Sequence, residues 1–243
     1  MTAARYIKLD ELRGLTLISM IAYHACWDLV YIKGWPLEFY TGKGAFVWQQ
    51  SICWTFILLS GFCATLGHHP LRRGLTVFGA GALVSVITYW FAYEERILFG
   101  ILTLLGSSMI VFAMMRKLLE RIPCEVGLLL SALAFVLSYS LKDGYLGIGD
   151  HRLALPGAWY VNWFTTYLGL PQEGFFSTDY FPLIPWFFLF LAGHFLGALL
   201  QKKGAMEYLR RGHFGALEWM GRHSLGIYLL HQPGLALCLG LLG

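Results

Sequence analysis

The sequence predicts an all-α, polytopic transmembrane helical bundle, and three observations support this fold class. The chain is 57% hydrophobic and 13% charged, with a mean hydropathy of +0.59, more apolar surface than a soluble domain of this length needs. Its apolar residues gather in runs of near-membrane length. Strand-like alternation is absent, and only helices or closed barrels can cross lipid. We therefore treat residues 1–243 as a single transmembrane domain.

Hydropathy gives seven candidate spans along the chain. They cover residues 14–32, 45–66, 73–92, 97–115, 125–141, 182–200 and 224–242. No small-residue cleavage site follows the first apolar run, so it is expected to be a retained span and not a signal peptide. The long segment 143–181 is rich in Trp and Tyr, and it is either an aromatic element at the lipid headgroups or a lid over an extracytoplasmic substrate such as a sugar.

The basic residues set the expected orientation of these spans. Thirteen of the eighteen Lys and Arg residues fall in one set of loops and five in the other. The positive-inside rule then places the N-terminus in the cytoplasm and the C-terminus outside it. The segment 143–181 faces outward in this topology.

The number and spacing of the cysteines argue against a zinc site or a disulfide framework. The five cysteines are an odd number and none forms a CxxC motif, so we expect neither a zinc site nor a set of disulfides. His194, in the sixth span, is expected to make a hydrogen bond between helices.

The most informative residue is His24, an ionisable side chain inside the first apolar run. It lies about 16 Å beyond Arg13 along a helix, which is near the midplane of a bilayer core about 30 Å thick. Asp10, Arg13, Leu17, His24 and Asp28 share one helical face, and charges persist in membranes mainly where they face a bundle interior or a wet cavity. Asp28 at i+4 either fixes the His24 tautomer and raises its basicity, or forms only a buried structural hydrogen bond with it. Asp10 and Arg13 are expected to form an ion pair at the cytoplasmic end of this span.

A second polar face occurs in the last apolar run. Ser224, Tyr228 and His231 share this face, and Pro233 can kink the helix just beyond them. The first and last spans run in the same direction, so His24 and His231 are expected at similar depth, within roughly 3 Å along the membrane normal. His231 is either part of a common site with His24 or a structural hydrogen-bonding residue.

Four stretches of the chain carry a resemblance to a known family. They are Leu9-Asp10-Glu11-Leu12-Arg13-Gly14 with Met20 and His24; Phe99-Gly100-Ile101-Leu102 with Gly106; Phe181-Pro182-Leu183-Ile184-Pro185-Trp186 with Gly193; and Gly221-Arg222 with Ser224-Leu225 and Tyr228-Leu229-Leu230-His231-Gln232-Pro233. With these stretches the chain resembles the catalytic domain of heparan-α-glucosaminide N-acetyltransferase and its bacterial relatives. The spacing of Asp10, Arg13 and His24 is also similar to the membrane acyltransferase-3 group, in which an intramembrane histidine at that position is the proposed catalytic residue.

The resemblance implies a membrane acyltransferase of the bacterial inner membrane. Such an enzyme moves an acyl group, acetyl for this family, from cytosolic acyl-CoA to an extracytoplasmic glycan or lipid headgroup. His24 would be the general base or a transient acyl carrier, with Asp28 and His231 beside it. The expected substrate-binding residues are Asp10, Arg13, Tyr228, Ser224, Trp186 and Gln232. We expect acyl-CoA as a co-substrate but no bound cofactor, no metal and no nucleic acid, while the oligomeric state stays open.

Two other classes of function fit the polar residues of the spans. A proton-coupled transporter could use His24, Asp28 and His231 as a relay, although no inverted repeat is visible. A b-type haem protein could use the paired histidines as axial ligands.

Overall fold

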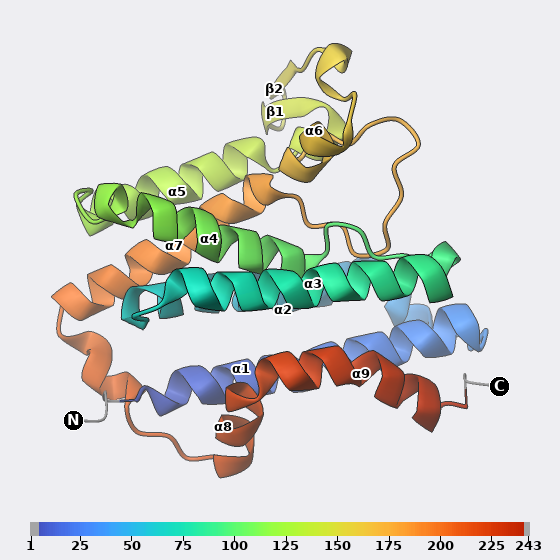
Figure 1. Ribbon diagram of the computed structural model, residues 1–243, viewed down its shortest axis with the longest axis horizontal. Helices are drawn as coiled ribbons and strands as arrows, with labels where there is room; N and C mark the ends of the chain where they lie inside the picture. Colours follow the sequence, from blue (N-terminus) through green and yellow to red (C-terminus); the bar gives the residue numbers. More distant parts are fainter. Residues whose placement is uncertain (1–4, 241–243) are drawn as a thin grey trace. The chain divides into compact units, whose positions relative to one another are not determined.

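The computed structural model describes residues 5–240, which are mostly helical (Figure 1). The chain divides into two compact units: residues 1–59 with 200–243, and residues 60–199. The boundaries fall inside α2 (Lys43–Leu66) and α7 (Leu183–Lys202). The all-α expectation is confirmed for the bulk of the chain.

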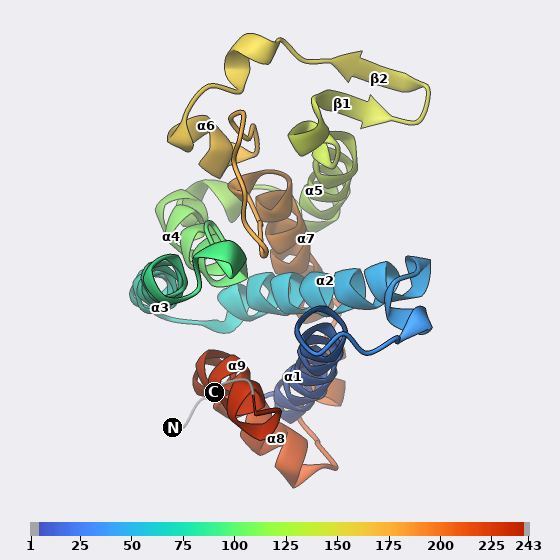
Figure 2. The ribbon, with the colours of Figure 1, turned by 90° about the vertical axis from the view of Figure 1, so that its right-hand side faces the viewer.

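The first unit is built on α1 (Ile7–Trp27), which continues into a π-helical turn (Asp28–Ile32). After α7 the chain returns through a short 3-10 helix (Ala205–Leu209) to α8 (Gly215–Arg222) and α9 (Ser224–Cys238). Both helices lie alongside α1 (Figures 1 and 2). They pack there because α1 and α2 present a buried apolar cluster of Leu17, Met20 and Ile52, against which Ile227 packs. This packing sets α1 and α9 side by side.

Six helices of the described residues are long and apolar enough to cross a membrane. They are Ile7–Ile32, Lys43–Leu66, Pro70–Phe91, Ile101–Leu119, Cys124–Asp143 and Leu183–Lys202. The expected seventh span corresponds to α9, which has 15 residues and is shorter than the roughly 17 residues that a spanning helix needs. Seven spans and the orientation of the termini therefore stay predictions.

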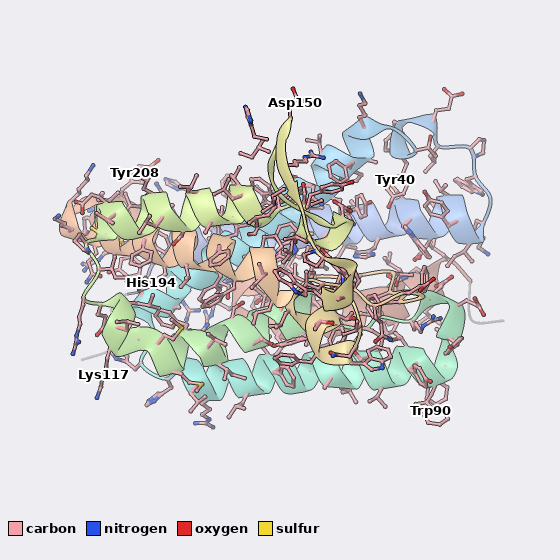
Figure 3. All side chains as sticks on the ribbon, turned by 90° about the horizontal axis from the view of Figure 1, so that it is seen from above. Tyr40, Trp90, Lys117, Asp150, His194 and Tyr208 are labelled. Carbon is pink, nitrogen blue, oxygen red and sulfur yellow. The ribbon has the colours of Figure 1, made fainter. Side chains whose placement is uncertain are left out.

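The second unit centres on the close packing of α3 (Pro70–Phe91) and α4 (Ile101–Leu119). A Cβ at Gly106 of α4 would overlap the backbone of Phe78 on α3, so glycine permits this approach. The two helices run in opposite directions: Trp90, near the end of α3, and Lys117, near the end of α4, lie at opposite ends of the pair (Figure 3). The third helix, α5 (Cys124–Ser138), meets α7 where the ring of Phe195 lies against Gly127.

The long segment 143–181 is more ordered than its composition suggests. It holds an antiparallel hairpin of β1 (Tyr145–Ile148) and β2 (His151–Ala154), followed by α6 (Trp163–Leu168) (Figure 2). The all-α expectation is wrong for this segment. Gly149 and Asp150 form a two-residue turn that suits a tight hairpin. Asp150 stands at the tip of this hairpin (Figure 3).

The fourth membrane-length helix begins four residues later than the expected start at residue 97. Phe99 has a left-handed φ of 55° and Gly100 is extended, so the helix begins at Ile101. Its first N–H donates to Oδ2 of Asp179 at 3.1 Å. The N–H of Phe181 donates to the carbonyl of Phe99 at 2.9 Å, so the two stretches Phe99–Leu102 and Phe181–Trp186 meet in this unit.

Candidate active site

The first unit brings His24 and His231 into contact. His24 lies three residues before the end of α1, and His231 lies at the middle of α9. Their ring centroids are 4.8 Å apart, with the rings tilted by 57°. The two histidines that were expected at similar depth therefore form one pair.

The hydrogen bond of His231 fixes its tautomer. Its Nδ1 lies at hydrogen-bonding distance from the carbonyl oxygen of Tyr228, and a carbonyl can only accept, so Nδ1 carries a proton. In the neutral imidazole the lone pair then belongs to Nε2. Nε2 is buried and has no hydrogen-bond partner within the described chain. His231 thus presents an oriented basic nitrogen.

His24 is held differently. No hydrogen bond to its ring is found among residues 5–240, and its other ring contact is with Tyr23 at 5.9 Å between centroids. Tyr23 in turn packs against Tyr40 at 5.0 Å and against Trp48 at 5.3 Å. His24 is half-buried and lies beside an aromatic cluster, without a hydrogen bond of its own in the described chain that would fix its ring.

Asp28 does not bind His24, which corrects the expectation from their i+4 spacing. Its Oδ1 accepts a hydrogen bond from Nε2 of Gln232 at 2.8 Å, and no bond joins Asp28 to His24 in the part of the chain that the structure describes. The side chain is 0% exposed. The reason is that α9 lies beside this end of α1 and offers an amide donor to the carboxylate. Asp28 Oδ2 and Gln232 Oε1 are buried without a hydrogen-bond partner among residues 5–240.

The paired histidines do not have the geometry of haem ligands. Two imidazoles on opposite faces of one iron need roughly 6 Å between ring centroids, since each metal–nitrogen bond is about 2 Å. The observed 4.8 Å leaves no room for a porphyrin between the rings. Within the described residues no three His, Cys, Asp or Glu side chains are grouped to hold a metal ion.

Asp10 and Arg13 lie at the other end of α1 and pair as expected. Arg13 donates to Oδ1 of Asp10 at 2.7 Å and to the carbonyl of Gly221 at 3.3 Å. Arg5 donates to Oδ2 of the same carboxylate at 2.9 Å. Arg13 is about 16 Å from His24 along the helix, so this ion-paired group is separate from the histidine pair.

The remaining expected residues divide between the two units. Tyr228 contacts His231 at 5.3 Å between ring centroids, and Ser224 begins the same helix, α9. Trp186 belongs to the second unit, where it is buried against Phe181 at 5.1 Å between centroids. His194, which Figure 3 labels, also lies in the second unit. Its Nδ1 is 3.0 Å from Thr65 Oγ1, so the expected interhelical hydrogen bond is confirmed.

Two residues with unusual surroundings were not singled out from the sequence. Tyr40 is 4% exposed, and burial raises the pKa of its hydroxyl. Burial also raises the pKa of Asp179 to about 6, although the bond from the Ile101 N–H opposes this shift. Both lie in segments between spans, where no pattern of the sequence marks a residue as buried.

Comparison with protein families gives a match that covers nearly the whole chain. The family model of the heparan-alpha-glucosaminide N-acetyltransferase catalytic domain matches residues 5–233. No curated protein and no solved structure matches the chain. The matched range includes both histidines of the pair, Asp28 and Gln232. The chain belongs to the heparan-alpha-glucosaminide N-acetyltransferase catalytic-domain family.

Proposed function

We propose that the protein transfers an acyl group, acetyl in the simplest case, from cytosolic acyl-CoA to an amine or hydroxyl of an extracytoplasmic glycan or lipid headgroup. The family is that of a membrane acetyltransferase, and six helices in the described part of the chain have the length and composition of membrane spans. The observation that carries the proposal is the buried, oriented Nε2 of His231 beside the ring of His24. A bacterial inner membrane would be its location.

In the proposed reaction His231 is the general base. Its Nε2 takes the proton of the acceptor amine or hydroxyl as that group attacks the thioester carbonyl carbon. The carbon–sulfur bond then breaks, and the proton passes to the departing CoA thiolate. A base placed in this way contributes a factor of about 10² to 10⁴ in rate. His24 either holds the carbonyl or carries the acyl group between two transfers.

Buried polar atoms of residues close in sequence to the two histidines favour binding of the acceptor there. Asp28 Oδ2, Gln232 Oε1 and His231 Nε2 are three buried atoms without partners in the described chain. With Asp28 ionised and His231 protonated at Nδ1, all three atoms accept hydrogen bonds, so they suit a ligand that donates them. Amines and hydroxyls donate, whereas a thioester carbonyl only accepts. The Tyr228 and Ser224 side chains are proposed to line the same site.

The acyl donor is proposed to arrive from the cytoplasmic side. The segment after α7 carries the exposed residues Lys203, Arg210 and Arg211, and such groups suit the phosphates of CoA. The orientation is testable with single cysteines in a background without native cysteines. An impermeant thiol reagent added to intact cells should label Asp150→Cys, at the hairpin tip, and leave Lys203→Cys unlabelled. Labelling of Lys203→Cys would show that the proposed orientation is wrong.

The decisive experiment follows labelled acetyl-CoA in membranes that contain the protein. Label should move to a glycan or lipid in the wild type. In His231→Ala the transfer should fall about 10²- to 10⁴-fold with little change in thermal stability. If His24 carries the acyl group, rapid quenching of His231→Ala should trap label on the protein and quenching of His24→Ala should not.

His194→Gln is the control, because it alters another histidine, one that hydrogen-bonds to Thr65 within the second unit. It should lower thermal stability while turnover per folded molecule stays the same. Label that remains on CoA in the presence of membrane extract would count against acyl transfer and favour a transporter. Normal turnover by folded His231→Ala would remove the assigned base.

A further inference from the structure

A buried polar contact joins Glu11 of α1 to the start of α8. Oε1 of Glu11 accepts hydrogen bonds from the backbone N–H of His213 at 2.5 Å and of Phe214 at 2.6 Å. Glu11 is 9% exposed. A carboxylate at this place satisfies N–H groups that precede the first turn of a helix and interacts favourably with the helix dipole. One buried side chain of α1 therefore fixes where α8 begins.

Two glycines bring α8 against the same turn of α1. A Cβ at Gly14 would overlap the carbonyl oxygen of Leu217, and a Cβ at Gly221 would overlap the carbonyl oxygen of Asp10. Arg13 adds a hydrogen bond to the Gly221 carbonyl at 3.3 Å. The whole length of α8 is thus held on the first turns of α1.

A one-residue, hydrogen-bonded joint connects α8 to α9. Only His223 separates the two helices, and its N–H donates to the carbonyls of Trp219 and Met220 at 3.2 and 3.1 Å. The Nδ1 of the same residue lies 2.8 Å from the Trp219 carbonyl, to which it donates. Displacement of α8 is therefore transmitted to the beginning of α9.

We propose that Glu11 is a positioning residue that sets where α9 lies along the axis of α1 and thereby keeps His231 beside His24. His231 is eight residues beyond the joint, about 12 Å along the helix, and a helix of this length transmits a shift of its start to its middle. A misplacement of about 1 Å can lower a rate about 100-fold. The effect on turnover rests on the proposed acyl transfer, but the positioning itself does not.

The competing explanation is that apolar packing alone places α9. Met220, Ile227 and Tyr228 pack against the cluster of Leu17, Met20 and Ile52, and Glu11 would then add only stability. The proximity of the two histidine positions separates the explanations. The probe is the double variant His24→Cys/His231→Cys in a chain whose five native cysteines are replaced by alanine, treated in membranes with a short bifunctional thiol reagent.

Glu11→Ala should slow this cross-linking several-fold, and Glu11→Gln should largely restore it, because an amide oxygen still accepts both N–H bonds. Glu218→Ala is the matched control: it removes an acid of α8 that pairs within its own helix with Arg222 at 3.7 Å, and it should leave cross-linking unchanged. If Glu11→Ala does not accumulate, Glu11→Asp, whose side chain is one methylene shorter, takes its place. The proposal is overturned if the variant that is recovered cross-links at the wild-type rate.

Turnover gives the second measurement, with both histidines present. Glu11→Ala should lower kcat about 10- to 100-fold with KM nearly unchanged, and Glu11→Gln should recover most of that loss. A lower amount of folded protein with unchanged kcat and unchanged cross-linking would show a purely structural role and refute the positioning. If the wild type transfers no acyl group, the proposed function fails while the cross-linking result still decides the role of Glu11.

Discussion

Removal of the Gln232 amide should destabilise the protein through the carboxylate that it leaves behind. Asp28 is 0% exposed and its bond from Gln232 Nε2 is 2.8 Å long. A hydrogen bond to a charged group contributes about 1.5–3 kcal/mol, and the burial of this carboxylate separates it from bulk solvent. We expect Gln232→Ala to lower the free energy of unfolding by about 2 kcal/mol.

The same change should cost less when the charge is absent. In an Asp28→Asn background the bond is between neutral groups and is worth about 1 kcal/mol. The double-mutant cycle should therefore show a coupling of about 1 kcal/mol between the two positions. Denaturant titration of the purified protein in detergent measures all four free energies.

Gln50→Ala provides the control for this cycle. Gln50 accepts an exposed hydrogen bond from Trp54 at 3.1 Å, and substitutions at such surface positions usually change stability by less than about 0.5 kcal/mol. If Gln232→Ala lowers the free energy of unfolding equally in the wild type and in Asp28→Asn, the assignment of the Asp28–Gln232 hydrogen bond is refuted. An equal cost for Gln50→Ala and Gln232→Ala would refute the effect of burial.

Three further predictions follow from the contacts described above. His24→Ala and His231→Ala should be non-additive in turnover, the double variant being no slower than the slower single one, as initial rates will show. Burial raises the pKa of Asp179 to about 6, so the folded protein binds a proton at this carboxyl more tightly than the unfolded chain does. Stability should therefore fall as the pH rises from about 4 to about 6, and thermal denaturation of Asp179→Asn should not show this fall. Gly106→Ala should destabilise by about 1–3 kcal/mol by overpacking, whereas Gly79→Ala, whose Cβ would meet no atom within 4 Å, should be neutral or slightly stabilising in the same assay.

The helices were predictable because their information is local. Apolar runs of membrane length give α1 to α5 and α7, and the shared direction of the first and last runs brings His24 to His231. The start of α4 was not predictable in this way, because Asp179, distant in sequence, caps Ile101. The hairpin at residues 145–154 was missed because its strands have four residues each and show no alternation long enough to detect.

The site shows the same division between local and distant information. Spacing on one helix correctly placed Asp28 on the face of His24, but it could not show that α9 supplies a better partner in Gln232. The role of Glu11 depends equally on residues some two hundred positions away, at His213 and Phe214. Side chains that bond across the fold cannot be assigned partners from one sequence, because each has many candidates of the same chemistry.

The unequal restraint of the two histidines has an entropic consequence. His231 is fixed by the Tyr228 carbonyl, so its rotamer freedom is lost once, when the chain folds. His24 has no such bond among the described residues, and any ligand that orders its ring must offset about 0.5–1.5 kcal/mol of side-chain entropy. Each catalytic cycle would then begin with His231 already aligned, while the alignment of His24 would depend on which molecule has bound.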